Sequence, residues 1–222
     1  MNMLKANGVS RTFRRGAGTV SAVQGITLEL PSGQLTAIVG RSGSGKSTLL
    51  NLLAGLLTPT EGTVLLDGQE LYRLPDAELS RLRSQKIGVI AQGQTALQNL
   101  TVLENIILPC ALYPGVSDAA GRAQALLERV GISRLATARP ASLSGGELRR
   151  MAVARALIRQ PSVILADEPT SDLDGENTAA VIALLRQAAD QGSAVLLVTH
   201  ETDCLKSADE VYRMDGGMLS NI

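Results

Sequence analysis

The sequence has 222 residues, with 21 basic and 21 acidic side chains, so its formal net charge is +0. Its hydrophobic fraction of 45% and charged fraction of 19% are typical of a globular protein with a buried core, which argues against wholesale disorder. The zero net charge argues against nucleic-acid binding through a broad basic surface, and an aromatic fraction of 2% leaves few side chains to stack on single-stranded bases.

The cysteines and the apolar runs indicate where the protein works. Cys110 and Cys204 form no C-x-x-C pair and are too few for a disulfide framework or a structural zinc site, so we expect two reduced thiols. The first 15 residues hold no apolar core of the signal-peptide kind, and no apolar run approaches the ~18–20 residues that span a bilayer. We therefore expect a protein kept inside the cell that reaches a membrane only through a partner chain.

The first part of the chain alternates short apolar runs with turn residues. Residues 20–30 and 35–39 are predicted strands, separated by a turn that contains proline and glycine. The second run, LTAIV, is apolar throughout, as in a strand buried on both faces of a parallel sheet. Apolar residues at helical spacing follow at 49–57. Further strands are predicted at 63–66, as one arm of a hairpin, and at 87–90.

The second part opens with a helical stretch. From about 101 to 159 the pattern is helical, with breaks predicted at Pro109, Pro114, Gly115, Gly131 and Pro140. Buried-strand composition returns at 163–166 and 194–198, with a helical pattern at 176–189 between them. This alternation predicts right-handed βαβ units. The expected fold class is therefore α/β, with a parallel-sheet core and a helical insertion near 93–160.

A phosphate-binding motif follows the predicted strand at 35–39. The segment 40–47 fits the pattern G-x-x-x-x-G-K-[ST], in which glycines let backbone N–H groups surround an anion and the next helix adds its positive end. Lys46 would reach the β- and γ-phosphates, and the Ser47 hydroxyl would ligate Mg²⁺. The predicted nucleoside-triphosphate site consists of Gly40, Arg41, Ser42, Gly43, Ser44, Gly45, Lys46, Ser47 and Thr48.

Two carboxylates follow the predicted strand at 163–166. Asp167 and Glu168 would lie at the carboxyl edge of a parallel sheet, where open α/β sheets bind their ligands. Asp167 is the candidate to hold Mg²⁺ through water, and Glu168 is the candidate general base for an attacking water. An Asp-Glu-Pro segment alone would equally suit a chain turn, but beside a phosphate loop we favour the catalytic interpretation.

A serine–glycine segment begins the predicted helix that precedes this strand. Ser144 and Glu147 fit an S-x-x-E capping box, which gives both residues a structural role. Capping does not account for Gly145 and Gly146, since a glycine in a first helical turn costs about 0.5–1 kcal/mol relative to alanine. Bare N–H groups at a helix N-terminus bind anions. The segment therefore predicts a second anion site, apart from the phosphate loop or across a subunit boundary.

The order of these motifs resembles one family. GRSGSGKS, a lone glutamine after a strand, LSGGE, VILADEP, SDLD and a late histidine are similar to the ATPase subunit of an ATP-binding cassette (ABC) transporter over essentially the whole chain. RTFRRGAGTVSAV and MDGGML resemble the small lipoprotein-release, macrolide-efflux, cell-division and peptide-resistance ATPases. The resemblance implies a P-loop NTPase fold in a single ABC ATPase domain, 1–222. Residues 1–92 and 161–222 would form the parallel-sheet core and an N-terminal antiparallel β subdomain, and 93–160 the α-helical subdomain with the signature motif.

Three further residues receive roles only through this resemblance. Gln92 matches the glutamine that ligates Mg²⁺ and senses the membrane partner, His200 the histidine that contacts the γ-phosphate, and Phe13 the aromatic that stacks on adenine. The structural alternatives are a surface glutamine, a structural histidine and a core phenylalanine. Two positions depart from the family pattern: Ala91 replaces a frequent aromatic, and Leu148 a frequent glutamine.

The signature motif would act across a dimer interface. In the family, residues matching Ser144, Gly145, Gly146 and Glu147, together with Asp174 of SDLD, contact the nucleotide bound by the other subunit. The second anion site would then serve the partner's ATP. Two nucleotides would lie between two head-to-tail monomers.

The implied function is an ATP-binding and ATP-hydrolysing subunit that uses ATP and Mg²⁺. The residues implicated are Glu168, His200 and Lys46 in catalysis and Ser47, Gln92 and Asp167 in metal binding. Its partners would be a transmembrane permease and a second copy of itself, at the cytoplasmic face of the cell membrane, in an export or lipoprotein- or peptide-handling system. Two alternatives stay open: a regulatory ABC ATPase that signals without transport, and a soluble one that acts on nucleic acid or the ribosome, which the zero net charge disfavours.

Overall fold

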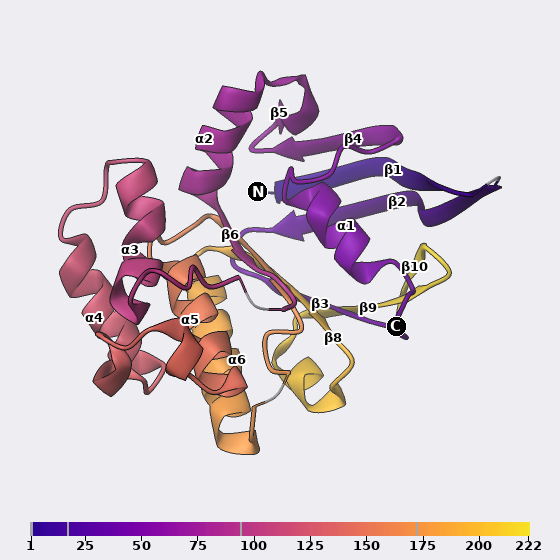
Figure 1. The fold of residues 1–222 in the computed structure, drawn as a ribbon. Helices are drawn as coiled ribbons and strands as arrows, with labels where there is room; N and C mark the ends of the chain where they lie inside the picture. Colours follow the sequence, from indigo (N-terminus) through magenta and orange to yellow (C-terminus); the bar gives the residue numbers. More distant parts are fainter. Residues whose placement is uncertain (1, 17, 94, 172) are drawn as a thin grey trace.

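The computed structural model describes residues 2–16, 18–93, 95–171 and 173–222. In these residues, two β-sheets and six α-helices make up the fold (Figure 1). The larger sheet has the strand order β10-β9-β3-β8-β7-β6, and the smaller has the order β2-β1-β4-β5. The smaller sheet and the helices α3, α4 and α5 lie on opposite sides of the larger sheet, which is the α/β architecture predicted.

The larger sheet is parallel except at one edge. Its strands are β3 (Leu35–Val39), β6 (Ile87–Ile90), β7 (Val163–Asp167), β8 (Ala194–Thr199), β9 (Glu210–Asp215) and β10 (Met218–Asn221). Only β10 runs antiparallel to its neighbour, β9. Every residue of β7 and β8 is buried, because apolar clusters cover both faces. The four strands predicted for this sheet are confirmed.

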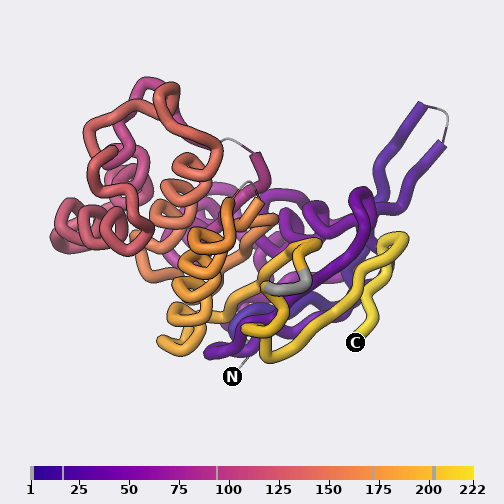
Figure 2. The backbone as a smooth tube through the Cα atoms, turned by 90° about the horizontal axis from the view of Figure 1, so that it is seen from below, coloured from indigo at the N-terminus to yellow at the C-terminus, as the bar shows by residue number. Residues whose placement is uncertain are grey.

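The smaller sheet is antiparallel. Its strands are β1 (Asn2–Arg15), β2 (Gly18–Pro31), β4 (Glu61–Leu66) and β5 (Gln69–Glu70). The predicted hairpin arm at 63–66 lies in β4 and turns into β5 through Asp67 and Gly68, both with positive φ, as a tight two-residue hairpin requires. Figure 2 shows the long β1–β2 pair projecting at the end opposite the helices.

The helices pack around these sheets. They are α1 (Lys46–Leu53), α2 (Asp76–Lys86), α3 (Val102–Leu112), α4 (Ala119–Arg129), α5 (Gly145–Leu157) and α6 (Gly175–Asp190). Helix α1 ends before the predicted residue 57, because Gly55 takes a left-handed conformation with φ 68. No described helix is long and apolar enough to cross a bilayer.

The break predicted at Pro109 is wrong. Helix α3 continues through Pro109 for three more residues, although proline removes one backbone hydrogen bond. Arg159 donates to the carbonyl oxygens of Pro109 and Tyr113 at the end of this helix. Val102 and Ile106 of α3 are fully buried against the other helices. Packing and these side-chain bonds therefore outweigh the local cost of proline, whereas the other four predicted breaks lie outside the α-helices.

The site is positioned by the carboxyl ends of four parallel strands. Strand β3 runs into Gly40, and β7 ends at Asp167. Strand β8 runs into His200, and β6 ends two residues before Gln92. Because carboxyl ends of parallel strands share one edge, residues distant in sequence meet there.

Candidate functional site

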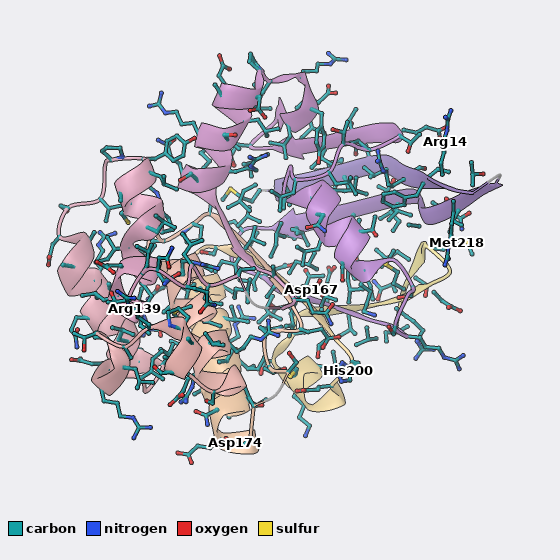
Figure 3. The ribbon with its side chains drawn as sticks, viewed as in Figure 1. Arg14, Arg139, Asp167, Asp174, His200 and Met218 are labelled. Atoms are coloured by element: carbon teal, nitrogen blue, oxygen red, sulfur yellow. The ribbon has the colours of Figure 1, made fainter. Side chains whose placement is uncertain are left out.

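The carboxyl edge of the larger sheet holds a cavity of about 630 Å³. The predicted site residues that line it are Gly40, Arg41, Ser42, Gly43, Gly45, Lys46, Ser47, Thr48, Gln92, Asp167, Glu168 and His200. Ser44 belongs to the loop but does not line the cavity. In Figure 3, Asp167 and His200 lie near the centre of the molecule at this edge, and Asp174 lies apart from them at the start of α6.

The shape of the phosphate loop requires its glycines. Gly45 has φ 106, and a Cβ there would lie 2.1 Å from the Ala22 carbonyl oxygen of β2. A Cβ on Gly40 would lie 2.2 Å from the Met214 carbonyl oxygen of β9. Gly217 N–H, in the β9–β10 turn, donates to the Ser44 carbonyl. The loop is thus packed between β2 and the β9–β10 hairpin.

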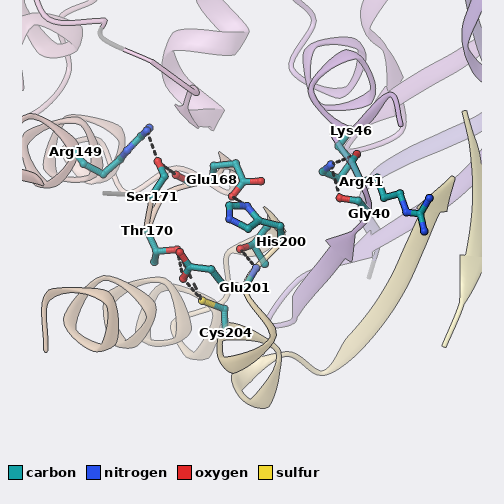
Figure 4. Close-up of polar contacts among 11 residues, drawn as sticks. Gly40, Arg41, Lys46, Arg149, Glu168, Thr170, Ser171, His200, Glu201 and Cys204 are labelled. Atoms are coloured by element: carbon teal, nitrogen blue, oxygen red, sulfur yellow. Dashed lines mark hydrogen bonds and ion pairs between the residues drawn. The ribbon is translucent and has the colours of Figure 1, made fainter. Parts of the chain in front are cut away.

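Two groups of the loop suit an anion. Lys46, the first residue of α1, is 8% exposed, and its Nζ lies 2.8 Å from the carbonyl oxygens of Gly40 and Arg41 (Figure 4). These acceptors are uncharged, so the ammonium charge adds to the positive end of α1. The buried Ser44 Oγ has no hydrogen-bond partner among the described residues. The loop therefore offers a cation and backbone N–H groups to phosphate oxygens.

The candidate metal ligands lie in the same cavity. Burial raises the pKa of Asp167, while a hydrogen bond with Ser47 and the Lys46 charge act in the opposite direction. The neighbouring Glu168 carboxylate also raises it, and a bound cation would relieve this repulsion. Mg²⁺ prefers oxygen ligands such as carboxylates, hydroxyls and amide carbonyls. The Ser47, Gln92 and Asp167 side chains therefore fit Mg²⁺.

Glu168 and His200 form a pair at the cavity edge. Glu168 is buried and has φ 49, a left-handed conformation that is strained for a residue other than glycine. Its N–H donates to the Val198 carbonyl oxygen at 2.8 Å, which ties this turn to β8. Its Oε2 lies 2.8 Å from His200 Nδ1, and the His200 side chain is 66% exposed. The carboxylate is thus fixed beside a ring that solvent or a ligand can reach.

His200 should titrate above the ordinary histidine range. The hydrogen bond and the negative charge of Glu168 raise its pKa above 6.5, Glu201 adds to this, and Lys46 opposes it. Because the folded-state pKa is raised, the pair stabilises the fold fully below about pH 6.5 and loses this effect as the pH rises through the folded pKa. His200 is the only histidine, so one ring signal reports it in NMR. The pH midpoint of the His200 ring titration should fall in Glu168→Gln, because the variant lacks the negative charge beside the ring. An unchanged midpoint contradicts the pairing.

The serine–glycine segment forms the predicted capping box. Ser144 is the N-cap of α5, its Oγ accepts from the Glu147 N–H, and the Glu147 carboxylate accepts from the Ser144 N–H at 2.9 Å. These bonds lower the pKa of Glu147. Ser144, Gly145 and Gly146 line a second hollow of about 280 Å³, together with Asp174. This hollow shares no lining residue with the phosphate-loop cavity.

Two other predicted features have different outcomes. Phe13, on β1, does not line the phosphate-loop cavity; it is 37% exposed, with the Arg11 guanidinium 4.8 Å from its ring centroid, so it is not a core residue. Asp172 of the SDLD segment lies outside the described residues.

The sequence did not single out Arg149, which donates hydrogen bonds to Ala91 and Ser171 beside the cavity. The only signal was its apolar surroundings in LRRMAVARAL.

The family model described as "ABC transporter" matches residues 23–171. The lipoprotein-releasing system ATP-binding protein LolD of Pseudomonas syringae pv. tomato is 41% identical over 219 residues, which cover 98% of this chain and 96% of that protein. The macrolide export ATP-binding/permease protein MacB of Chlorobaculum tepidum is 39% identical over 217 residues, covering 98% of this chain but only 33% of that protein.

Solved structures give the same result. The dimeric structure of a post-hydrolysis state of the ATP-binding cassette MJ0796, bound to ADP and Pi, has a TM-score of 0.93 and 33% identity, covering 99% of this chain and 98% of that one. A nucleotide-free ATP-binding cassette from an ABC transporter shares the fold, with a TM-score of 0.82 at 24% identity. The chain therefore belongs to the ABC transporter family, as one of its ATPase domains, and its relatives include two of the groups that the motifs predicted.

Proposed function

We propose that this chain is the ATP-hydrolysing subunit of an ABC transporter, which works as a head-to-tail dimer around two MgATP and drives a transmembrane permease. The observation that carries the proposal is the meeting of Lys46, Asp167, Glu168 and His200 in one cavity, with the Ser144 turn in a separate hollow. In this arrangement one subunit supplies the residues that hydrolyse its ATP. Its signature motif is then available to contact the nucleotide of another subunit.

Binding uses the phosphate loop. Loop N–H groups, the N-terminus of α1 and Lys46 hold the phosphates, and the exposed ring of Phe13 stacks on adenine. Ser47, Gln92 and Asp167 would hold Mg²⁺, which would supply positive charge to neutralise the phosphates. The cavity volume and the uncharged acceptors of Lys46 both support this assignment.

Glu168 is the general base in this proposal. The oxygen of a water attacks the γ-phosphorus, its proton passes to the Glu168 carboxylate, and the bond to the β–γ bridging oxygen breaks to give ADP and phosphate. His200 orients the carboxylate through their contact and reaches the γ-phosphate with its exposed ring. Lys46 stabilises the developing charge.

The signature motif completes the partner's site. Ser144, Gly145, Gly146 and Glu147, with Asp174, would close over the γ-phosphate held by the other subunit. Their separate hollow supports this arrangement, and so does the similarity to a cassette described as dimeric and bound to ADP and Pi. The proposed subdomain 93–160 and Gln92 would pass this closure to the permease.

The proposed partner is a permease at the cytoplasmic face of the membrane. LolD is named for a lipoprotein-releasing system and MacB for macrolide export, which favours an export or lipoprotein-handling role here. The tagged chain should co-purify from detergent-solubilised membranes with a membrane-spanning protein, because its surface must contact the partner it drives. An untagged chain is the control.

The same preparation separates the alternatives. A substrate that stimulates ATP hydrolysis in the complex indicates transport, whereas a regulatory ATPase keeps its rate unchanged by every candidate substrate. Recovery with ribosomes instead of a membrane protein contradicts the proposal and favours the nucleic-acid alternative.

A further inference from the structure

We propose that Arg149 is a positioning residue that couples the two ATP sites of the dimer. It ties the helix that carries Ser144, which serves the partner's nucleotide, to the Gln92 segment and the Glu168 turn of its own subunit. This inference rests on the proposed function, since it needs a dimer with shared sites.

The guanidinium of Arg149 joins three segments. Arg149 lies in the second turn of α5 and is 9% exposed. Its Nη1 donates to the Ala91 carbonyl oxygen at 2.9 Å, and its Nη2 donates to Ser171 Oγ at 2.7 Å. Ser171 Oγ in turn donates to the Glu168 carbonyl oxygen at 3.0 Å (Figure 4). One side chain therefore reaches the residue before Gln92 and the turn that contains the base.

Arg149 makes this link without an ion pair. Among the described residues, no carboxylate lies within salt-bridge distance of it, and both of its acceptors are uncharged. Burial of a cation without a paired anion is costly. The planar guanidinium fixes the directions of two hydrogen bonds at once, which a lysine ammonium does not. The guanidinium therefore fixes the positions of both segments, and its charge also acts on the Asp167 carboxylate in the cavity.

The helix transmits displacement between the shared sites. Arg149 follows Ser144 by five residues, about 7.5 Å along the axis of a rigid α-helix. When Ser144 engages the partner's ATP, α5 shifts with it, and Arg149 carries Ala91 and Ser171 along. Each subunit thereby adjusts its own Gln92 and Glu168 in response to the nucleotide on its partner. ATP hydrolysis should then be cooperative, with a Hill coefficient above 1 for two coupled sites.

The kinetic test compares Arg149→Gln with Arg159→Gln. Arg159 also donates to two carbonyl oxygens, those of Pro109 and Tyr113, but neither adjoins the cavity. In Arg149→Gln, kcat should fall roughly tenfold to a hundredfold, since small misplacement of catalytic groups costs that much. Its Hill coefficient should fall below the wild-type value, with the Kd for ATP unchanged. Arg159→Gln should keep the wild-type kcat and Hill coefficient. Wild-type hydrolysis without cooperativity, or equal losses in both variants, overturns the inference.

A second measurement needs no ATP. In the nucleotide-free protein, amide hydrogen exchange should become faster in the peptides that contain Ala91 and Ser171 in both Arg149→Gln and Arg149→Lys, and not in Arg159→Gln. Arg149→Lys keeps the charge and covers the case in which the glutamine variant does not fold. Unchanged exchange at both peptides overturns the link. Absence of ATP hydrolysis in the wild type would instead count against the proposed function, so the two failures are distinguishable.

Discussion

Glu168→Gln should bind ATP normally and hydrolyse it roughly 10²–10⁴ times more slowly than the wild type, which is the usual contribution of a general base. Glutamine has the same shape and tolerates the buried left-handed turn equally, but its amide cannot take a proton from water. Phosphate release measures the rate, and calorimetry measures the binding. Glu128→Gln, at an exposed position of α4, is the matched control and should keep the wild-type rate. Normal turnover in Glu168→Gln removes Glu168 from the role of base.

The same variant should trap the dimer. Because the nucleotide persists, size-exclusion chromatography with MgATP should show a stable dimer of Glu168→Gln, which disappears without nucleotide. Adding Ser144→Arg should prevent this dimer, because a large cation would fill the hollow that Ser144 lines. If the double variant dimerises as well as Glu168→Gln alone, the signature turn does not contact the partner's nucleotide.

Lys46→Ala should lose most of its affinity for ATP. A charged hydrogen bond is worth about 1.5–3 kcal/mol, so the Kd should rise roughly tenfold to a hundredfold or more. The carbonyl oxygens of Gly40 and Arg41 that lose their donor lie at a cavity that water can enter, so the fold should persist. Calorimetric titration with MgATP measures the affinity, and thermal unfolding checks the fold.

A second lysine provides the matched control. Lys86→Ala removes a more exposed lysine that pairs with Asp67 in the hairpin turn and does not line the cavity, so it should bind ATP as the wild type does. Unchanged affinity in Lys46→Ala would remove Lys46 from the site.

The sequence predicted the parts of the fold whose local signal agrees with their tertiary environment. The strands at 35–39, 163–166 and 194–198 are apolar throughout, because both of their faces are buried, and all three are confirmed. Strands β9 and β10 were not predicted, since most of their residues are partly or fully exposed and give no apolar run. Pro109 misled the prediction because Arg159, fifty residues away, bonds the end of α3.

The residues of the candidate site also differ in whether a local sequence pattern reveals them. The residues from 40 to 48 could be identified because the loop motif, the strand before it and the helix after it are contiguous in sequence. Arg149 could not, because its acceptors are a backbone oxygen and a hydroxyl on segments 58 and 22 residues away, which no local pattern encodes. Ser144 shows a further limit of the sequence. The capping box explains the presence of Ser144 within one chain, whereas its proposed ligand is a nucleotide bound by the other subunit.

The contacts of the phosphate loop with the β9–β10 hairpin bear on how the protein matures during translation. A nascent chain that has emerged as far as residue 200 already displays the whole glycine-lysine-serine motif. It still lacks Met214, whose carbonyl oxygen lies close to Gly40, and Gly217, whose N–H donates to the Ser44 carbonyl. Tight ATP binding should therefore begin only after β9 and β10 have joined the sheet. A ribosome-bound intermediate that lacks these strands should bind ATP weakly.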